Sequence, residues 1–291
     1  MVQAFLLKET SFLDKFSFPV PYAAGKMQKS LRILYLGDIV GKPARKFLGE
    51  RLPHIREVNN IDLVIANGEN ATSGAGINLK SIRELKAARV DIITLGDHVL
   101  DRDFCTEADE VQDLGKVCMP CNLESKINCP KFVTCEIGGI KVGVCIVLGR
   151  QFMKLQASCP FKKFDEMFAK YGNSVDIFTV EIHAEVTSEK IACGWYADGK
   201  ASLIVGSHTH VQTADDCILP HGTAYITDLG MCGAHRSVIG RDISSVLESF
   251  INGTRCKLAI AEEDLRLNGC IVDFDPTTKH PKKISRFVHL A

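Results

Sequence analysis

Residues 31–38 read LRILYLGD, a short apolar run followed directly by a glycine and a carboxylate. Similar apolar runs, each of which stops at glycine or at a charged or imidazole residue, recur in DLVIANGEN at 62–70, DIITLGDH at 91–98, DIFTVEIH at 176–183, ASLIVGSHTH at 201–210 and TAYITD at 223–228. Continuous Val, Ile and Leu runs of this length are typical of strands buried on both faces. The pattern therefore predicts a set of buried strands, each of which ends in polar side chains.

Helical patterns lie between several of these strands. The helices predicted from apolar spacing, caps and turns are Arg45–Asn59 with a kink at Pro53, a helix capped by Asn78, and a helix from Thr187 or Ser188 through Trp195. Strands that alternate with helices predict an α/β fold. Because no internal repeat or low-complexity linker interrupts the pattern, residues 31–291 are predicted to form a single domain.

Composition excludes several classes of protein. The chain has 291 residues, of which 46% are hydrophobic, and its 35 basic residues balance its 35 acidic ones. A chain of this size and apolar content can bury a large core, so disorder is not expected. A protein that binds nucleic-acid phosphates needs a net basic face, and none stands out in this sequence. No stable nucleic-acid binding is therefore expected. No apolar run approaches the roughly 18–20 residues of a membrane span, which predicts a soluble protein without a membrane partner.

Residues 1–30 are expected to be an extension outside this domain. The second methionine, Met27, stands just before the first predicted strand, so the segment is either poorly ordered or the product of an upstream start codon. The short apolar stretch Ala4–Leu7 is followed by charges, unlike the apolar region of a secretory signal. A cytoplasmic location is therefore expected.

The chain is rich in cysteine. Its 12 cysteines all lie between Cys105 and Cys270, and several occupy positions in predicted strands. Cys118 and Cys121 form a CxxC pair, but the second pair of a zinc ribbon is absent. Reduced structural thiols are the favoured interpretation, while a metal or redox role for the CxxC pair stays open.

The polar strand ends indicate a metal site. In α/β sheets, ligands bind beyond the carboxyl ends of the strands, where these side chains are expected to meet. The candidate metal ligands are Asp38, Glu69, Asn70, Asp97, His183, His208 and His210. A set of oxygen and nitrogen donors this large exceeds one tetrahedral zinc and suits two divalent ions such as Mn, Fe, Zn or Co. Two such ions can activate water and clamp the oxygens of a displacement at phosphorus.

Taken singly, each of these residues is a weak signal. An isolated His-x-His pair such as His208 and His210 is often structural, and Asp38 is also compatible with a helix cap. Ser188–Lys190 is interpreted as a helix cap with Glu189 in the first turn. Only the ordered set of strand ends is specific.

That order resembles the calcineurin-like metallophosphoesterases. The motifs are Gly37-Asp38, Gly68–Asn70, Gly96–His98, the single His183 and Gly206–His210. The stretches HAEVTSEK at 183–190, HTHVQTAD at 208–215 and AYITDLGM at 224–231 resemble one bacterial branch, the YmdB-like phosphodiesterases that act on 2′,3′-cyclic nucleotides. The resemblance implies a four-layer αββα sandwich of two mixed sheets flanked by helices, two metal ions (iron or manganese), and a cytoplasmic homo-oligomer.

The resemblance also implies roles for individual residues. Asp38, Glu69, Asn70 and His210 match the ligands of one metal, with Glu69 as the bridge, and Asp97, His183 and His208 match those of the second. His98 matches the proton donor, and Asn122 matches a position in a motif associated with substrate. The expected activity is a metal-dependent phosphodiesterase in which metal-bound hydroxide attacks phosphorus and His98 protonates the leaving sugar oxygen.

Three positions depart from the family pattern. Val40 replaces the superfamily's usual histidine, as in the YmdB-like branch, and Asn70 is expected to supply the missing contact. Asp97 stands where asparagine is usual and adds negative charge. Met119 stands where the branch commonly has arginine, which puts phosphate affinity and substrate identity in question.

Three other functions are compatible with parts of the sequence. An amidohydrolase-type barrel also uses a His-x-His pair, but near its first strand. A regulatory or interaction protein with a metal site and low turnover would fit the changes at Asp97 and Met119. A metal-independent redox protein would use Cys118 and Cys121.

Overall fold

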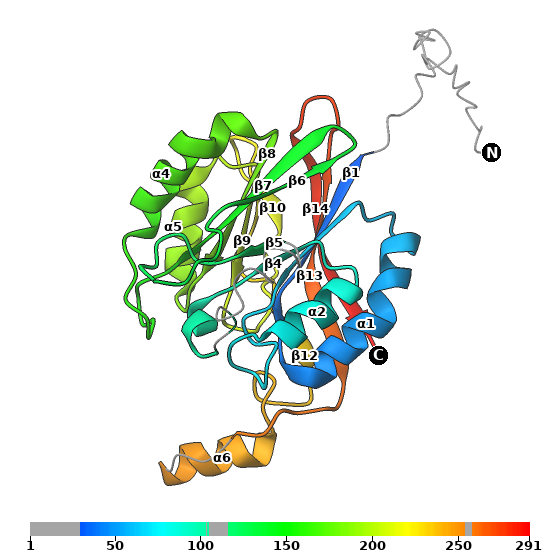
Figure 1. Cartoon of the computed structure of the whole chain (residues 1–291), viewed down its shortest axis with the longest axis vertical. Helices are drawn as coiled ribbons and strands as arrows, with labels where there is room; N and C mark the ends of the chain where they lie inside the picture. Colours follow the sequence, from blue (N-terminus) through cyan, green and yellow to red (C-terminus); the bar gives the residue numbers. More distant parts are fainter. Residues whose placement is uncertain (1–29, 103, 105–115, 254–257) are drawn as a thin grey trace, which may run out of the picture.

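Two β-sheets form the centre of the protein (Figure 1). The computed structural model describes residues 30–102, 104, 116–253 and 258–291, so the predicted N-terminal extension lies outside the described residues except for Ser30. The first sheet has the spatial order β2 (Asp38–Ile39), β12 (Met231–Ala234), β13 (Leu265–Phe274), β1 (Leu31–Leu36), β3 (Leu63–Asn67), β4 (Ile92–Thr94) and β5 (Lys116–Cys118), with β14 (Pro281–Leu290) paired to β13.

The second sheet is smaller. Its spatial order is β10 (Cys217–Ile218), β11 (Ala224–Ile226), β9 (Leu203–Ser207), β8 (Ile177–His183), β7 (Ile140–Leu148) and β6 (Val133–Ile137). Both sheets are mixed. The strands β1, β3, β4 and β5 run parallel, as do β7, β8, β9 and β11, while β13, β14, β6 and β10 pair antiparallel to their neighbours.

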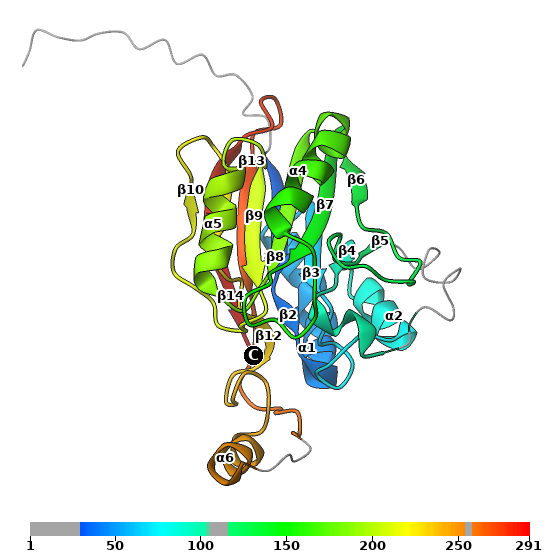
Figure 2. The ribbon, with the colours of Figure 1, turned by 90° about the vertical axis from the view of Figure 1, so that its left-hand side faces the viewer.

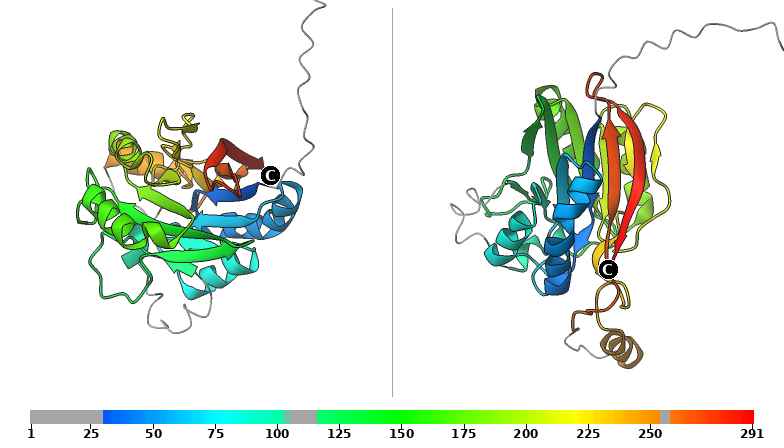
Figure 3. Two further views of the ribbon diagram at one scale, coloured as in Figure 1. Left: turned by 90° about the horizontal axis from the view of Figure 1, so that it is seen from above. Right: turned by 90° about the vertical axis from the view of Figure 1, so that its right-hand side faces the viewer.

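Helices cover the outer face of each sheet (Figures 2 and 3). The helical elements are α1 (Gly41–Val58), α2 (Leu79–Ala87), η1 (Asp97–Leu100), α4 (Pro160–Tyr171), η2 (Gly172–Ser174), α5 (Thr187–Ala197) and α6 (Ile243–Asn252). The helices α1 and α2 pack on the first sheet, whereas α4 and α5 pack on the second. The predicted α/β sandwich of four layers is confirmed.

The predicted helices are found with small changes at their ends. The amide of Ser81 donates to the Asn78 side chain, which caps α2 as expected. Helix α1 begins at Gly41, four residues before the predicted start at Arg45, and continues through Pro53 to Val58. Pro43 falls in the first turn of α1, where the missing N–H costs no helical hydrogen bond.

Alternation along the strands separates three hydrophobic cores. In β1, Ile33 and Tyr35 face the second sheet, whereas Leu34 and Leu36 face α1 and α2. In β8, Val180 and Ile182 pack under α4 and α5. Strands buried on both faces explain the continuous apolar runs in the sequence. Among the described residues, no helix combines the length and apolar character needed to span a membrane.

Helix α6 projects from the end of the molecule that carries β12 (Figures 1 and 2). It buries only Val246. The side chains of Ile243, Leu247, Phe250 and Ile251 are exposed. The helix is therefore held at its base and contributes little to the three cores.

Three glycines allow the backbone to pack closely at the strand ends. A Cβ atom on Gly37 would lie 1.9 Å from the Gly230 carbonyl oxygen, and one on Gly206 would lie 1.8 Å from the Thr227 carbonyl oxygen. A Cβ on Gly96 would lie 2.1 Å from a carboxylate oxygen of Glu69. These glycines precede or begin the polar stretches at the strand ends, so close backbone packing fixes where those stretches start.

Replacing Gly37 with alanine is expected to lower the free energy of unfolding by about 1–3 kcal/mol, because neighbouring backbone must move to admit the methyl group. Gly49→Ala is the matched control: nothing lies within 4 Å of the added Cβ on the exposed face of α1. It is expected to stabilise the protein by about 1 kcal/mol through helix propensity. Urea unfolding of both variants measures the difference, and equal effects would contradict the packing argument.

Candidate metal centre

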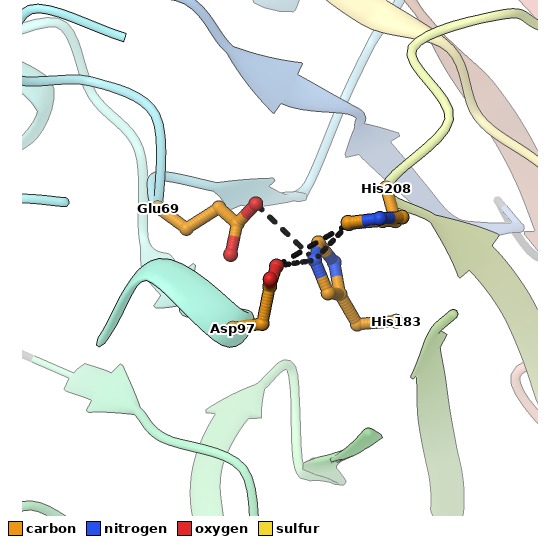
Figure 4. Close-up of side chains that lie close together, drawn as sticks. All are labelled: Glu69, Asp97, His183 and His208. Atoms are coloured by element: carbon orange, nitrogen blue, oxygen red, sulfur yellow. Dashed lines mark hydrogen bonds and ion pairs between the residues drawn. The ribbon is translucent and has the colours of Figure 1, made fainter. Parts of the chain in front are cut away.

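Polar side chains from both sheets meet beyond the carboxyl ends of the parallel strands. Glu69 follows β3, Asp97 follows β4, His183 ends β8 and His208 follows β9. One ligand atom from each of these four residues lies within 4.8 Å of the others (Figure 4). The structure thus brings together residues that are separated by up to 139 positions, as the strand-end pattern predicts.

The spacing within this group suits a shared cation. His183 Nε2 lies 3.0 Å from Asp97 Oδ1 and 3.2 Å from Glu69 Oε1, and His208 Nδ1 lies 3.0 Å from His183 Nε2. Donor atoms about 2.1 Å from a common ion lie roughly 3.0–3.4 Å apart. The measured separations match that geometry.

Each histidine near the group turns one ring nitrogen inward and the other toward an oxygen. His183 Nδ1 lies 2.8 Å from Ser207 Oγ, His208 Nε2 lies 3.1 Å from a Glu185 carboxylate oxygen, and His210 Nδ1 lies 3.0 Å from the Ile239 carbonyl oxygen. Metal-binding histidines are typically oriented in this way, since the outer hydrogen bond fixes the tautomer that leaves the inner nitrogen free.

A second group lies beside the first. The Asn70 amide nitrogen is 2.8 Å from Glu69 Oε1 and 3.3 Å from His210 Nε2. Asp38 Oδ1 lies 4.0 Å from His210 Nε2, while Asp38 Oδ2 accepts the His208 amide. Glu69 adjoins both groups. Helix α1 is capped at Val40, so the alternative that Asp38 caps a helix is wrong.

Burial and close pairs of opposite charge act against each other in the electrostatics of the site. Asp38, Glu69 and Asp97 are all buried. Burial raises the pKa of Asp38 to about 7. Burial opposes ionisation of Glu69 and Asp97 as well, but the neighbouring imidazoles outweigh it and lower the pKa of both carboxyls. The same carboxylates raise the pKa of His183 well above its usual value despite its burial. The group therefore favours positive charge at its centre.

Two further observations test whether the residues fit a divalent ion. Asp38 Oδ1 is buried and has no hydrogen-bond partner among the described residues. Such an orphaned oxygen is costly unless a cation or another donor compensates it. A Cβ on Gly96 would lie within 2.4 Å of both Glu69 Oε2 and His183 Nε2, so a glycine keeps open the space between two of the donors. The residues fit a metal ion on both counts.

The remaining predicted site residues lie in different surroundings. His98 directly follows Asp97, and its backbone amide donates to Glu69 Oε2 at 3.2 Å. Its partly exposed ring has Nδ1 2.7 Å from an Asp101 carboxylate oxygen. Asn122 is buried, and its amide group bonds to the backbone of Leu148 and Ser158. These bonds connect the segment after β5 to the end of β7 and to the segment before α4, and the substrate role of Asn122 stays a prediction.

The His208–His210 loop is held by a buried ion pair that the sequence patterns did not indicate. Lys190 is fully buried, and its ammonium lies 2.7 Å from Asp228 Oδ2. The same oxygen accepts the Thr209 hydroxyl at 2.7 Å. His208 and His210 both have positive φ angles, 97° and 65°, which are unfavourable for residues other than glycine. The buried ion pair therefore stabilises a strained loop.

The interpretation of Ser188–Lys190 as a helix cap is wrong. Val186 is the N-cap of α5 and makes no side-chain cap. Glu189 lies in the first turn as expected, but its carboxylate accepts the amides of Arg150 and Gln151. A lysine and an acidic residue in a first helical turn resemble solvent-facing charges, so the sequence alone gave no sign of their burial.

The described cysteines are free thiols. Cys118 and Cys121 are both buried. Burial raises the pKa of the Cys118 thiol well above its usual value, which makes the thiolate scarce. This agrees with the structural interpretation of the CxxC pair and gives the redox alternative no support. The two-sheet sandwich likewise excludes the amidohydrolase-type barrel.

Comparison with known proteins identifies the family. The profile described as YmdB-like protein matches residues 34–287 of this chain. The chain belongs to the YmdB-like family. One curated relative is the 2′,3′-cyclic-nucleotide 2′-phosphodiesterase of Bacillus subtilis, which is 36% identical to this chain over 258 residues. The alignment covers 89% of this chain and 97% of the relative.

Solved structures give the same result. A phosphatase from Mycoplasma pneumoniae superposes with a TM-score of 0.84 at 33% identity, covering 91% of this chain and 95% of the other. A protein from Thermus thermophilus gives 0.82 at 36% identity, with 89% and 99% covered. The resemblance drawn from the strand-end motifs is confirmed, and the YmdB-like protein is a hydrolase of phosphoric esters.

Replacing Lys190 with methionine is expected to lower the free energy of unfolding by about 3–5 kcal/mol, because it leaves Asp228 buried without its cation. Lys200→Ala is the control, since Lys200 pairs with Asp165 at 3.2 Å on the surface with both side chains more than 40% exposed. That variant should lose less than about 1 kcal/mol. Urea denaturation measures both, and a loss at Lys190 no larger than at Lys200 would contradict the role of the buried pair.

Proposed function

We propose that this protein is a binuclear metal-dependent phosphodiesterase that hydrolyses small phosphodiesters, with 2′,3′-cyclic nucleotides as the substrate class. The observation that carries the proposal is the orientation of His183, His208 and His210, each with one nitrogen turned toward a carboxylate group and the other bound to an oxygen. The named activity of the Bacillus subtilis relative supports the substrate class.

The ligand assignment divides the site into two halves. Asp38, Asn70 and His210 would hold one ion, Asp97, His183 and His208 would hold the other, and Glu69, which adjoins both groups, would serve both. Mixed oxygen and nitrogen donors suit iron or manganese, with zinc and cobalt also compatible. When bound, two divalent ions supply Lewis acidity that activates water and neutralises charge on the phosphoryl oxygens.

The protein itself supplies the proton. His98 lies at the edge of the site, because its amide is bound to Glu69 while its ring is partly exposed. The Asp101 carboxylate, 2.7 Å from Nδ1, favours a proton on that nitrogen, so Nε2 is the ring nitrogen left to act on a substrate. A protonated His98 can donate to the departing sugar oxygen and so prevent an alkoxide from forming.

A regulatory protein with bound metal and low turnover is the second candidate. Met119 is fully buried and provides no cation for phosphate, and Asp97 adds a negative charge to the candidate metal group. This candidate predicts stoichiometric metal, negligible hydrolysis, and a binding partner that is retained in Asp38→Ala. The homo-oligomeric state and the cytoplasmic location stay predictions.

Removal of metal is expected to abolish hydrolysis and lower the thermal midpoint, because a ligand that binds only the native state stabilises it by about 2.7 kcal/mol at one hundred times its Kd. Dialysis against a chelator followed by metal analysis, calorimetry and assay with bis(p-nitrophenyl) phosphate tests this. Manganese or iron should restore both properties. Full activity in metal-free protein would refute the proposal.

His98→Ala is expected to lower kcat by about 10²–10⁴ on 2′,3′-cyclic nucleotides, with metal content unchanged, because it removes the proton donor. His221→Ala is the matched control, since His221 pairs with Asp198 at 3.0 Å but is exposed away from the cluster. An unchanged rate in His98→Ala would exclude it as general acid. Activity on other phosphodiesters but not on cyclic nucleotides would exclude the proposed substrate class.

A further inference from the structure

A fully buried carboxylate, Glu181, lies behind the metal centre. It comes from β8, two residues before His183, and therefore faces the same side of the strand. Three donors from three other strands bind it: the Tyr35 hydroxyl at 2.7 Å, the Asn67 amide at 2.6 Å and the Ser207 hydroxyl at 2.6 Å. Neither the strand-end motifs nor the proposed ligand set includes Glu181.

The Ser207 hydroxyl links this carboxylate to His183. A serine hydroxyl has one proton, and here Glu181 accepts it. The contact of 2.8 Å between Ser207 Oγ and His183 Nδ1 must then have the imidazole as donor. His183 consequently donates through Nδ1, so that Nε2, which faces Glu69 and Asp97, is the nitrogen available to a metal ion.

Asn67 links the same carboxylate to the proposed bridging ligand. Its amide nitrogen donates to Glu181, and its amide oxygen accepts the backbone N–H of Glu69 at 2.9 Å. Both ends of the Asn67 side chain are therefore used, which fixes its orientation. The turn that presents Glu69 is thus connected to the residue that orients His183.

We propose that Glu181 is a positioning residue of the metal centre: through Ser207 it imposes the Nδ1–H tautomer on His183, and through Asn67 it fixes the backbone at Glu69. This inference rests on the proposed metal-dependent function. Glu181 would contact neither metal nor substrate. Its role is to orient two ligands, His183 and Glu69, which come from different sheets. Outer hydrogen-bond partners of this kind typically contribute 10- to 100-fold to metal affinity.

Four single variants test the proposal. Glu181→Met removes the acceptor at nearly constant volume and frees the Ser207 proton to point at His183. Ser207→Ala deletes the link itself. Glu181→Gln keeps an amide oxygen that can accept from Ser207 and is the conservative rescue. Thr179→Val is the matched control: Thr179 lies on the same side of β8, and its buried hydroxyl has no partner among the described residues.

The measurements are Zn²⁺ affinity, by competition with a chromophoric chelator, and ¹⁵N NMR of the histidine rings in the Zn²⁺-loaded protein. Glu181→Met and Ser207→Ala are expected to bind Zn²⁺ 10- to 100-fold more weakly than wild type, while Glu181→Gln stays within about threefold and Thr179→Val is unchanged. Wild type should show a slowly exchanging proton on His183 Nδ1 that is lost in Ser207→Ala.

Two results overturn the inference, and they differ in what they imply. Wild-type affinity in both Glu181→Met and Ser207→Ala would refute the positioning role and leave the proposed function intact. Failure of wild type to bind Zn²⁺, Mn²⁺ or Fe²⁺ would refute the proposed function and the inference with it. Should Glu181→Met not fold, Ser207→Ala alone decides, because it removes only one hydroxyl oxygen, just as Thr179→Val removes one buried hydroxyl group.

Discussion

The burial of negative charge beneath the strand ends is the constraint on which the structure depends. Asp38, Glu69 and Asp97 are almost inaccessible to solvent, although an ionised carboxylate is costly to remove from water. Imidazole donors offset part of this cost, and the orphaned oxygen of Asp38 shows that they do not offset all of it. A site with these properties can hold a metal ion.

Neither sheet forms the site alone. The carboxylates lie on or just after strands of the first sheet, Asp38 in β2, Glu69 after β3 and Asp97 after β4. The imidazoles come from the second sheet, with His183 at the end of β8 and His208 and His210 after β9. The packing of the two sheets therefore sets the distances between donors. Behind this layer, the Lys190–Asp228 ion pair holds the loop of His208 and His210, while Glu181 connects three strands below His183.

The fold class and the residues that meet could be predicted from the sequence, because both follow from local pattern. Apolar runs indicate strands buried on both faces, and the polar residues after them indicate a common edge of the sheet. The Lys190–Asp228 ion pair and the role of Glu181 could not be predicted in this way. A charged residue inside an apolar run or in the first turn of a helix gives no local sign of its partner, since that partner lies in a distant segment of the chain. The hydrogen bonds of Asn122 to the backbone were beyond prediction for the same reason.

The three crowded glycines bear on how such motifs are interpreted. Gly37, Gly96 and Gly206 stand next to the polar residues of the site, yet the space around each is limited by backbone or by a neighbouring donor. The packing therefore requires glycine at these positions whether or not a protein of this fold turns over substrate. A motif search based on them would therefore recover inactive descendants of this fold together with working enzymes, and only the donor atoms themselves can separate the two groups.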